Sequence, residues 1–305
     1  MTITHLVTHS GGFHADELLS SVILTRLFPK AELVRSRDAA WTTAAPDKII
    51  YDVGREYDAD AQIFDHHQRP NPLREDGQPY SSFGLIWAHY GRDYLRDFGV
   101  PDADIEDIHS SFDNGFVLPI DLVDNGDLAP VTAGQLAGLT LPALLGTLKP
   151  VFDDRSPDAD DHAFAAALPI ARAFIEGSIA GKAAKRRAEA VVLDAIAQAG
   201  QSRVLELPMG MPFRKAIETA GADHLLFVVH PRESDWAITG IRLSGDGFEQ
   251  RADLPAAWAG LTDDALEAAC GVKGAKFCHN GLFIAVASTR EAALEMADLA
   301  VLNAM

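Results

Sequence analysis

Short apolar segments alternate with helical segments near the start of the chain, and this alternation constrains the fold more than any other feature. Four apolar runs are predicted strands: residues 3–8, 31–35, 48–52 and 62–65. Residues 16–28 and 81–98 carry apolar side chains at helical spacing. Because strands and helices that alternate with short connections are typical of a parallel sheet covered by helices, we expect an α/β fold here.

The pattern changes further along the chain, which at 305 residues is about twice as long as a typical domain. Alanine-rich helices are predicted at residues 142–152, 160–179 and 183–199, the last two separated by Gly177 and Gly181. Strands are predicted again at residues 204–207, 224–230, 236–243 and 282–287, before a closing helix at 289–303. The change near Gly200 predicts two domains, residues 1–200 and a smaller α+β domain at residues 201–305.

The charge of the chain limits its partners. It carries 26 Lys and Arg against 44 Asp and Glu, a net charge of −18, which repels a polyphosphate backbone at long range and disfavours duplex DNA. Its two cysteines cannot form a disulfide framework. The N-terminus has no signal-like pattern, and no run approaches the roughly 20 apolar residues that span a bilayer. We therefore expect a cytoplasmic protein with no membrane segment.

The sharpest local motif is His-Ser-Gly-Gly-Phe-His-Ala-Asp-Glu at residues 9–17, at the junction of the first strand and the first helix. In parallel sheets, ligands bind beyond the carboxyl ends of the strands. The imidazoles of His9 and His14 and the carboxylate of Asp16 can converge there on a divalent cation. By itself the motif fits equally well an N-cap at Asp16 beside surface histidines.

Similar motifs recur at the ends of later segments. Asp52 ends one apolar run, residues 65–69 (Asp-His-His-Gln-Arg) end the next, and Asp121 and Asp124 lie three residues apart on a helical segment. Each motif alone is also typical of a turn. Together, however, they place many carboxylates at one edge of the predicted sheet, where the charges repel one another unless cations are bound. The set of motifs therefore predicts a metal site.

These motifs resemble the DHH superfamily of metal-dependent phosphoesterases and, more closely, the melanocyte-proliferating-gene (MYG) family, UPF0160. Residues 253–260, 277–281 and 293–297 resemble the same family, so the likeness covers essentially the whole chain. Ser10 stands where the family pattern has Asn, and residues 128–161 match no family segment that we can name. The resemblance implies a DHH-type parallel sheet flanked by helices, with a smaller C-terminal domain of the DHHA1 type that binds substrate.

The resemblance also implies two bound ions. Mn²⁺ is preferred over Mg²⁺ or another divalent metal because the ligands mix imidazole with carboxylate. The expected ligands of one ion are His9, His14 and Asp52. Those of the second ion are Asp16, Asp52, His66 and Asp124, with Asp121 as an alternative to Asp124. Asp52 is therefore expected to be shared by the two ions.

Other residues are expected to support catalysis. Asp65 is expected to orient a histidine, while His67 and Arg69 donate to phosphate oxygens, and Arg37 is a further candidate for the same surface. The resemblance places His279, Asn280 and Gly281 in the loop that binds the rest of the substrate. From the residues alone, Asn280-Gly281 is also a common hairpin turn.

The predicted function is that of a Mn²⁺-dependent phosphodiesterase or 3′–5′ exonuclease acting on single-stranded RNA or short oligonucleotides. The alternatives are a small-molecule phosphatase or pyrophosphatase, the metal-dependent protein hydrolase that family members have also been labelled, and a metal- or nucleotide-binding protein without turnover. The expected partners are RNA, oligonucleotides or another phosphoester, with no duplex DNA and no membrane. A homodimer is left open.

Overall fold

A computed structural model of the chain describes residues 2–244 and 247–304. The chain divides into two compact units, Met1–Ala183 and Ala184–Met305, inside the long helix α7 (Ala159–Ala199). Gly200, near which the sequence predicted the boundary, directly follows the last residue of this helix. The early part of α7, with Phe164 and Ile179, packs into the core of the first unit, whereas Val192 packs with Leu205 of the second.

The sheet of the first unit has the strand order β2-β1-β3-β5-β4. The strands are β1 (His5–Thr8), β2 (Glu32–Arg35), β3 (Lys48–Tyr51), β4 (Tyr57–Asp58) and β5 (Ile63–Phe64). β1, β2, β3 and β5 are parallel, as predicted. β4 was not predicted and pairs antiparallel with β5 at the edge. The parallel strands therefore direct their carboxyl ends to one edge of the sheet.

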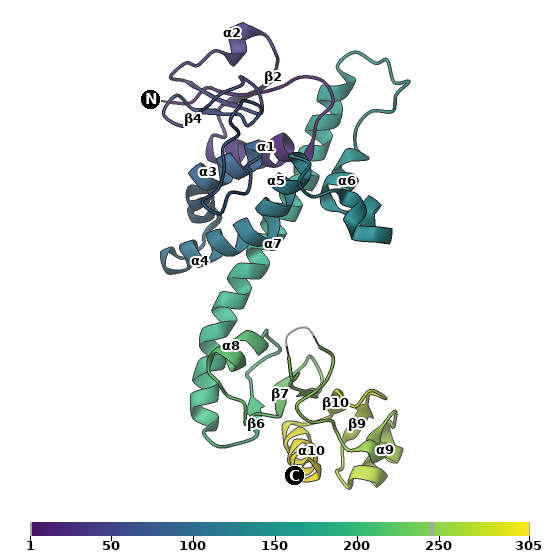
Figure 1. Cartoon of the computed structure of the whole chain (residues 1–305). Helices are drawn as coiled ribbons and strands as arrows, with labels where there is room; N and C mark the ends of the chain where they lie inside the picture. The colour runs from purple at the N-terminus through teal and green to yellow at the C-terminus, as the bar shows by residue number, and fades with distance from the viewer. Residues whose placement is uncertain (1, 245–246, 305) are drawn as a thin grey trace. The chain divides into compact units, whose positions relative to one another are not determined.

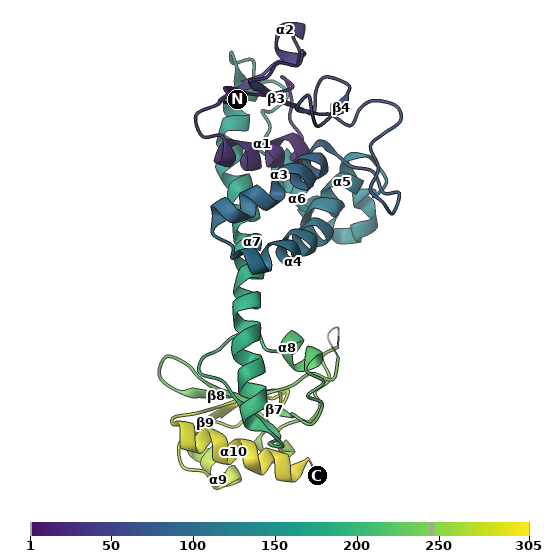
Figure 2. The same cartoon turned by 90° about the vertical axis from the view of Figure 1, so that its left-hand side faces the viewer.

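Helices cover this sheet and make the first unit an α/β fold. They are α1 (Ala15–Leu27), α2 (Ala39–Thr42), α3 (Ser82–Phe98), α4 (Asp102–Phe112), the π-helix η1 (Asp113–Val117), α5 (Leu118–Asp124), the 3₁₀ segment η2 (Pro130–Leu139) and α6 (Leu141–Gly146). Figures 1 and 2 show α1 and α3 side by side against the sheet. Alternate strand residues face the two sides: Leu6 belongs to the core with α1 and α3, and Val7 packs on the other side with Trp41 of α2.

The helix α7 is continuous over 41 residues, although two helices separated by glycines were predicted. Gly177 and Gly181 lie in helical backbone, and the buried positions Ile175, Ile179 and Ala183 continue one stripe across them. Burial of this stripe outweighs the modest helical penalty of glycine. α7 is also long and apolar enough to span a membrane by length and composition, with a window of mean hydropathy 1.4. Core helices of other proteins pass the same test, so this is weak evidence for a membrane segment.

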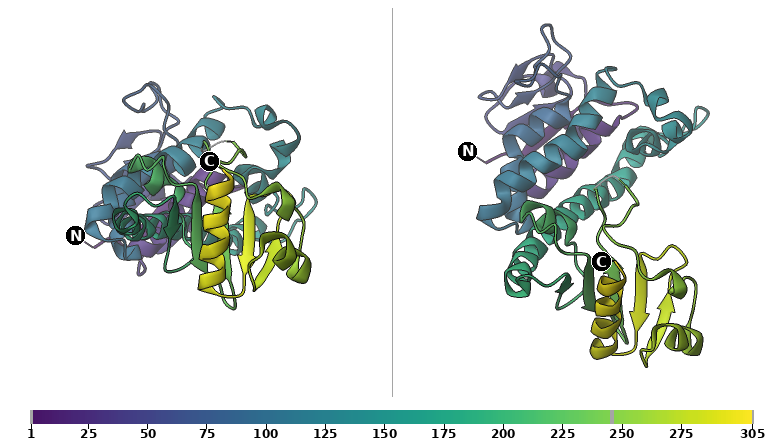
Figure 3. Two further views of the ribbon diagram at one scale, coloured as in Figure 1. Left: turned by 90° about the horizontal axis from the view of Figure 1, so that it is seen from below. Right: turned by 60° about the horizontal axis from the view of Figure 1, so that its bottom comes forward.

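The second unit is α+β, as predicted, and its sheet has the order β6-β7-β8-β10-β9. The strands are β6 (Val204–Glu206), β7 (Phe227–Pro231), β8 (Trp236–Gly240), β9 (Ala275–Cys278) and β10 (Ile284–Ala287). β6 and β7 are parallel and the other pairs antiparallel. The helices are α8 (Arg214–Thr219), the 3₁₀ turn η3 (Ala256–Trp258), α9 (Asp263–Cys270) and α10 (Arg290–Asn303). Met296 and Ala297 of α10 are buried in the core with Ile238 of β8. Figure 3 shows α10 lying against this sheet.

Candidate metal centre

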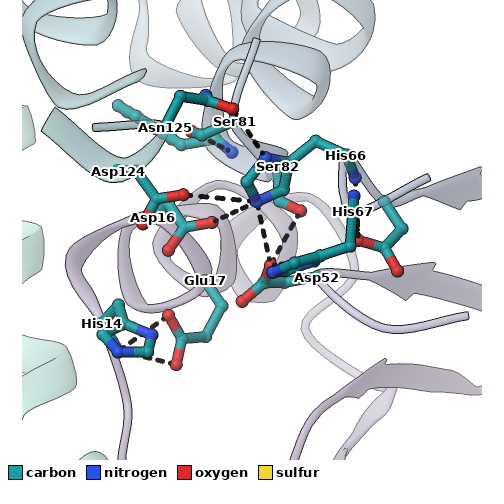
Figure 4. Close-up of polar contacts among 12 residues, drawn as sticks. His14, Asp16, Glu17, Asp52, His66, His67, Ser81, Ser82, Asp124 and Asn125 are labelled. Carbon is teal, nitrogen blue, oxygen red and sulfur yellow. Dashed lines mark hydrogen bonds and ion pairs between the residues drawn. The ribbon is translucent and has the colours of Figure 1, made fainter. Parts of the chain in front are cut away.

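The carboxyl ends of three parallel strands bring the predicted motifs together. His9 follows β1, Asp52 follows β3, and His66 lies two residues beyond β5. β1 pairs with β3 and β3 with β5, so these residues emerge next to one another. Asp16 from the first turn of α1 and Asp124 from the end of α5 complete the group, as Figure 4 shows. The predicted convergence of separate motifs is therefore observed.

Asp52 lies between two histidines. Its Oδ2 is 3.2 Å from Nε2 of His9, and its Oδ1 is 3.4 Å from Nε2 of His66. The Asp52 backbone has φ 54°, in the left-handed region that non-glycine residues seldom adopt. Burial alone would raise the pKa of this carboxyl, but the adjacent imidazoles of His66 and His9 bring it below its usual range. Asp52 thus has the position expected of a ligand shared by two ions.

The imidazole of His66 is oriented by Asn125. Nδ2 of Asn125 donates to the carbonyls of Tyr80 (3.0 Å) and Asp121 (2.9 Å), which leaves Oδ1 to accept from Nδ1 of His66 at 3.3 Å. His66 therefore presents Nε2 to the site. This nitrogen is buried without a hydrogen-bond partner. It faces carboxylates instead, at 3.3 Å from Oδ2 of Asp124 and 3.9 Å from Oδ2 of Asp16.

Asp16 is the strongest sign that the site is built for a cation. Its side chain is only 1% exposed, and neither carboxylate oxygen has a hydrogen-bond partner. Burial raises its pKa well above the usual range, and the nearby charges of Asp52 and Asp124 raise it further. The two carboxylate oxygens of Asp16 and Nε2 of His66 are thus buried without hydrogen-bond partners. A divalent cation bound between these two side chains would satisfy all three atoms.

His9 presents its Nε2 in the same way. Its Nδ1 donates to the carbonyl of Ser10 at 3.1 Å, so Nε2 faces Oε1 of Glu17 at 3.0 Å. Burial alone would lower the pKa of His9, but the hydrogen bonds to Asp52 and Glu17 raise it to about 10. In the metal-free protein a proton therefore occupies the place that a metal ion would take.

Glu17 is a candidate ligand that the sequence analysis did not identify. Its side chain is fully buried, and both oxygens accept from the backbone N–H of His14, at 2.8 and 2.9 Å. This bond forms a capping box at the start of α1. The spacing of His14 and Glu17 could have indicated the capping box, but only the fold shows that Glu17 also reaches His9.

Among the described residues, potential ligand atoms form four overlapping groups, within each of which they lie no more than 4.8 Å apart. Two of these groups share no residue: one is His9, His14 and Glu17, and the other is Asp16, His66 and Asp124. Asp52 joins them because it contacts both His9 and His66. The residues present thus fit two divalent cations with a shared carboxylate, the arrangement expected from the resemblance.

Asp121, the predicted alternative to Asp124, lies outside this cluster. It is fully buried, and its oxygens accept from Ser81 Oγ (2.6 Å), the backbone N–H of Gly84 (3.1 Å) and Arg74 Nη2 (2.5 Å). Asp121 belongs to none of the groups of potential ligand atoms among the described residues, whereas Asp124 forms one with Asp16 and His66. Asp124 is therefore the residue of the pair that can act as a ligand.

Asp65 holds His67 in place. Its Oδ1 accepts from Nδ1 of His67 at 2.7 Å, and its Oδ2 accepts from the backbone N–H of Arg55 at 2.6 Å. The hydrogen bond to Asp65 raises the pKa of His67. Half-exposed His67, together with Arg37 and Arg69, lines a cavity of about 1150 Å³. The same cavity is lined by the candidate ligands His9, His14, Asp52, His66 and Asp124. His67, Arg37 and Arg69 therefore stand where they can meet a ligand.

The predicted substrate loop lies in the second unit, between β9 and β10. Nδ1 of His279 accepts from the backbone N–H of Gly281 at 2.9 Å, and its ring packs 4.4 Å from the ring of Phe283. Asn280 lies at the tip, close to Gly260. These contacts close a turn between two antiparallel strands. Substrate binding by these three residues stays a prediction.

Fold and site define the class of the protein: the ends of parallel strands gather histidines and carboxylates in the manner of metal-dependent hydrolases. The family model described as uncharacterised protein family UPF0160, MYG1_exonuc, matches residues 5–301. The chain belongs to this family, which confirms the membership expected from the motifs.

Similar proteins are known across eukaryotes. The MYG1 exonuclease of Homo sapiens is 32% identical over 320 residues, which cover 95% of this chain and 84% of the relative. The MYG1 protein of Schizosaccharomyces pombe is 29% identical, covering 97% of this chain and 96% of its own. Among solved structures, an exonuclease RecJ bound to manganese is 16% identical and covers 97% of this chain and 90% of that chain, with a TM-score of 0.26. A likeness at that score says nothing about substrate or ion.

Proposed function

We propose that the chain is a Mn²⁺-dependent phosphodiesterase that removes nucleotides in the 3′–5′ direction from single-stranded RNA or short oligonucleotides. The observation that carries the proposal is the place of Asp52 between His9 and His66, beside the unpartnered oxygens of Asp16. The name exonuclease, which curated relatives bear over nearly the whole length of this chain, supports phosphoester chemistry.

Different residues have different roles in the proposed reaction. Two divalent ions held by the cluster would activate water and neutralise charge on the phosphoryl group. Asp65 accepts from Nδ1 of His67 and raises the pKa of this histidine, which favours the imidazolium form, whose Nε2–H can donate to a phosphate oxygen. Arg69 and Arg37 line the same cavity and offset the negative charge that develops during phosphoryl transfer.

The cavity favours a substrate larger than a single phosphate ester. Its volume of about 1150 Å³ exceeds the roughly 300–1,000 Å³ typical of pockets for small molecules. The net charge of −18 disfavours a long duplex, which needs an extended basic surface. A short single strand meets both conditions.

The test compares substrates with the metal-reconstituted protein. Single-stranded RNA labelled at its 5′ end should give a ladder of shortened products with Mn²⁺, whereas duplex DNA, pyrophosphate and casein should not be consumed. Asp52→Asn should abolish this activity because asparagine keeps the left-handed backbone accessible but removes the shared charge. Asp153→Asn, at an exposed carboxylate outside the cavity, is the matched control. If the protein released phosphate from pyrophosphate but did not cleave RNA, it would be a pyrophosphatase. If it cleaved casein, it would be a protein hydrolase, and in either case the present proposal would be wrong.

A further inference from the structure

Four cationic side chains surround the cavity of the metal centre. Arg37 follows β2, Arg55 follows β3, Arg69 follows β5 and Lys149 follows α6, so they come from four separate segments. None of the four forms an ion pair with a carboxylate among the described residues of the chain. The rim of the cavity therefore carries positive charge that the protein itself does not neutralise.

Elsewhere in the first unit, arginines are paired with carboxylates. The paired residues are Arg26, Arg35, Arg74, Arg92, Arg96 and Arg172. Besides the three arginines of the rim, only Arg155 has no such pair within residues 2–183. In a chain with 44 Asp and Glu, arginines without carboxylate partners thus concentrate at one cavity. This concentration indicates an anionic ligand.

Two rim residues that the motifs did not single out are tied to the metal centre. The backbone N–H of Arg55 donates to Oδ2 of Asp65, the carboxylate that orients His67. Nζ of Lys149 lies 5.9 Å from the centre of the ring of Phe13, a buried residue of the first metal motif. The backbone of Arg55 and the ammonium group of Lys149 are therefore held beside the candidate metal centre, and both side chains line its cavity.

We propose that Arg55 and Lys149 bind the phosphates that neighbour the scissile one, and so select a single-stranded oligonucleotide over an ester with one phosphate. The inference rests on the proposed function and names a feature of its substrate. An arginine fork matches two oxygens of a phosphate, and lysine supplies a point charge. Because the metal ions, His67, Arg37 and Arg69 are assigned to the reacting phosphate in the proposed function, Arg55 and Lys149 are the cations left for its neighbours.

The experiment uses Arg55→Ala and Lys149→Ala in the full-length, metal-loaded protein, with Arg155→Ala as the matched control. Two substrates are compared, a single-stranded RNA pentamer and bis(p-nitrophenyl) phosphate, which has one phosphate. We expect the ratio of kcat/KM for the pentamer to that for the small diester to fall about tenfold or more in each rim variant. The Arg155→Ala variant should keep the wild-type ratio.

A binding measurement makes the test independent of turnover. Fluorescence anisotropy of a labelled pentamer should show weaker binding to both rim variants. The slope of log affinity against log salt should become shallower by about 0.7 for each phosphate contact removed. If the wild type bound the pentamer without cleaving it, and Arg55→Ala weakened that binding, the proposed function would be contradicted but this inference would be kept. Equal binding and an unchanged ratio in the rim variants would overturn the inference while the proposed function stands.

Discussion

Asn125 fixes the hydrogen-bonding role of His66 from a different segment of the chain. The amide group of Asn125 donates to two backbone carbonyls, so its oxygen must accept from Nδ1 of His66, 3.3 Å away. His66 then directs Nε2 at Asp124 and Asp52. The hydrogen bond thus joins the motif after β5 to the motif at the end of α5.

Replacing Asn125 should weaken metal binding without removing a ligand. Leucine at this position cannot accept from Nδ1 of His66, so the ring loses its orientation, and we expect the affinity for Mn²⁺ to fall about 10–100-fold. Isothermal titration calorimetry measures this affinity. Asn114→Leu, at an exposed asparagine of η1, is the control. Wild-type affinity in Asn125→Leu would show that the hydrogen bond does not orient the ligand.

Metal binding should release protons, and the affinity should rise with pH. The hydrogen bonds to Asp52 and Glu17 raise the pKa of His9 to about 10, so this imidazole is protonated in the metal-free protein near neutral pH. His9 must lose its proton to bind an ion, and raising the pH towards its pKa removes this competition. Burial also raises the pKa of Asp16 well above its usual range, which adds to the competition from protons. Calorimetry in buffers with different ionisation enthalpies counts the protons released. A binding enthalpy that is the same in all buffers would show that no proton is released and would contradict the protonated state assigned to His9.

Glu17→Gln separates the ligand role of Glu17 from its role at the start of α1. Glutamine can still accept from the backbone N–H of His14, so the capping box and the melting temperature should change little. The negative charge beside His9 is lost, and we expect the content of bound Mn²⁺ to fall after dialysis. If the variant kept the wild-type metal content, Glu17 would serve only to cap the helix.

Two glycines should respond to alanine in opposite ways. A Cβ at Gly84 would lie 2.1 Å from Oδ2 of Asp121, so Gly84→Ala should disturb the buried bonds of that carboxylate and lower the free energy of unfolding by about 3 kcal/mol. A Cβ at Gly177 in α7 meets no atom within 4 Å, and Gly177→Ala should stabilise by about 0.5–1 kcal/mol. Urea unfolding of the metal-free protein compares the two. If Gly84→Ala kept the wild-type free energy of unfolding, the side chain of Asp121 could move away from its hydrogen-bond partners without a loss of stability.

The sequence predicted the parallel strands and the edge at which the motifs meet. His9, Asp52 and His66 follow apolar runs, and a carboxylate or imidazole directly after such a run is visible without coordinates. The antiparallel strand β4 was missed because Tyr57–Asp58 is exposed and polar. Its pairing depends on the neighbouring strand β5 and not on its own composition.

Distinctions within the site depended on tertiary contacts. Spacing along the sequence could not tell which of Asp121 and Asp124 faces the candidate metal centre. Only the folded structure shows that Asp121 forms an ion pair with Arg74, a residue distant in sequence. A π-helical segment, Asp113–Val117, lies directly before α5, and the apolar spacing of the sequence did not predict it. Glu17 looked like a capping residue, and its contact with His9 exists only in the folded unit.

The central claim is that one carboxylate, Asp52, serves two adjoining metal positions. Its most direct test is the metal content of wild type and Asp52→Asn after dialysis against Mn²⁺, measured by inductively coupled plasma mass spectrometry. We predict about two ions per chain in the wild type and loss of both in the variant. Two ions retained by Asp52→Asn would contradict the shared-ligand account.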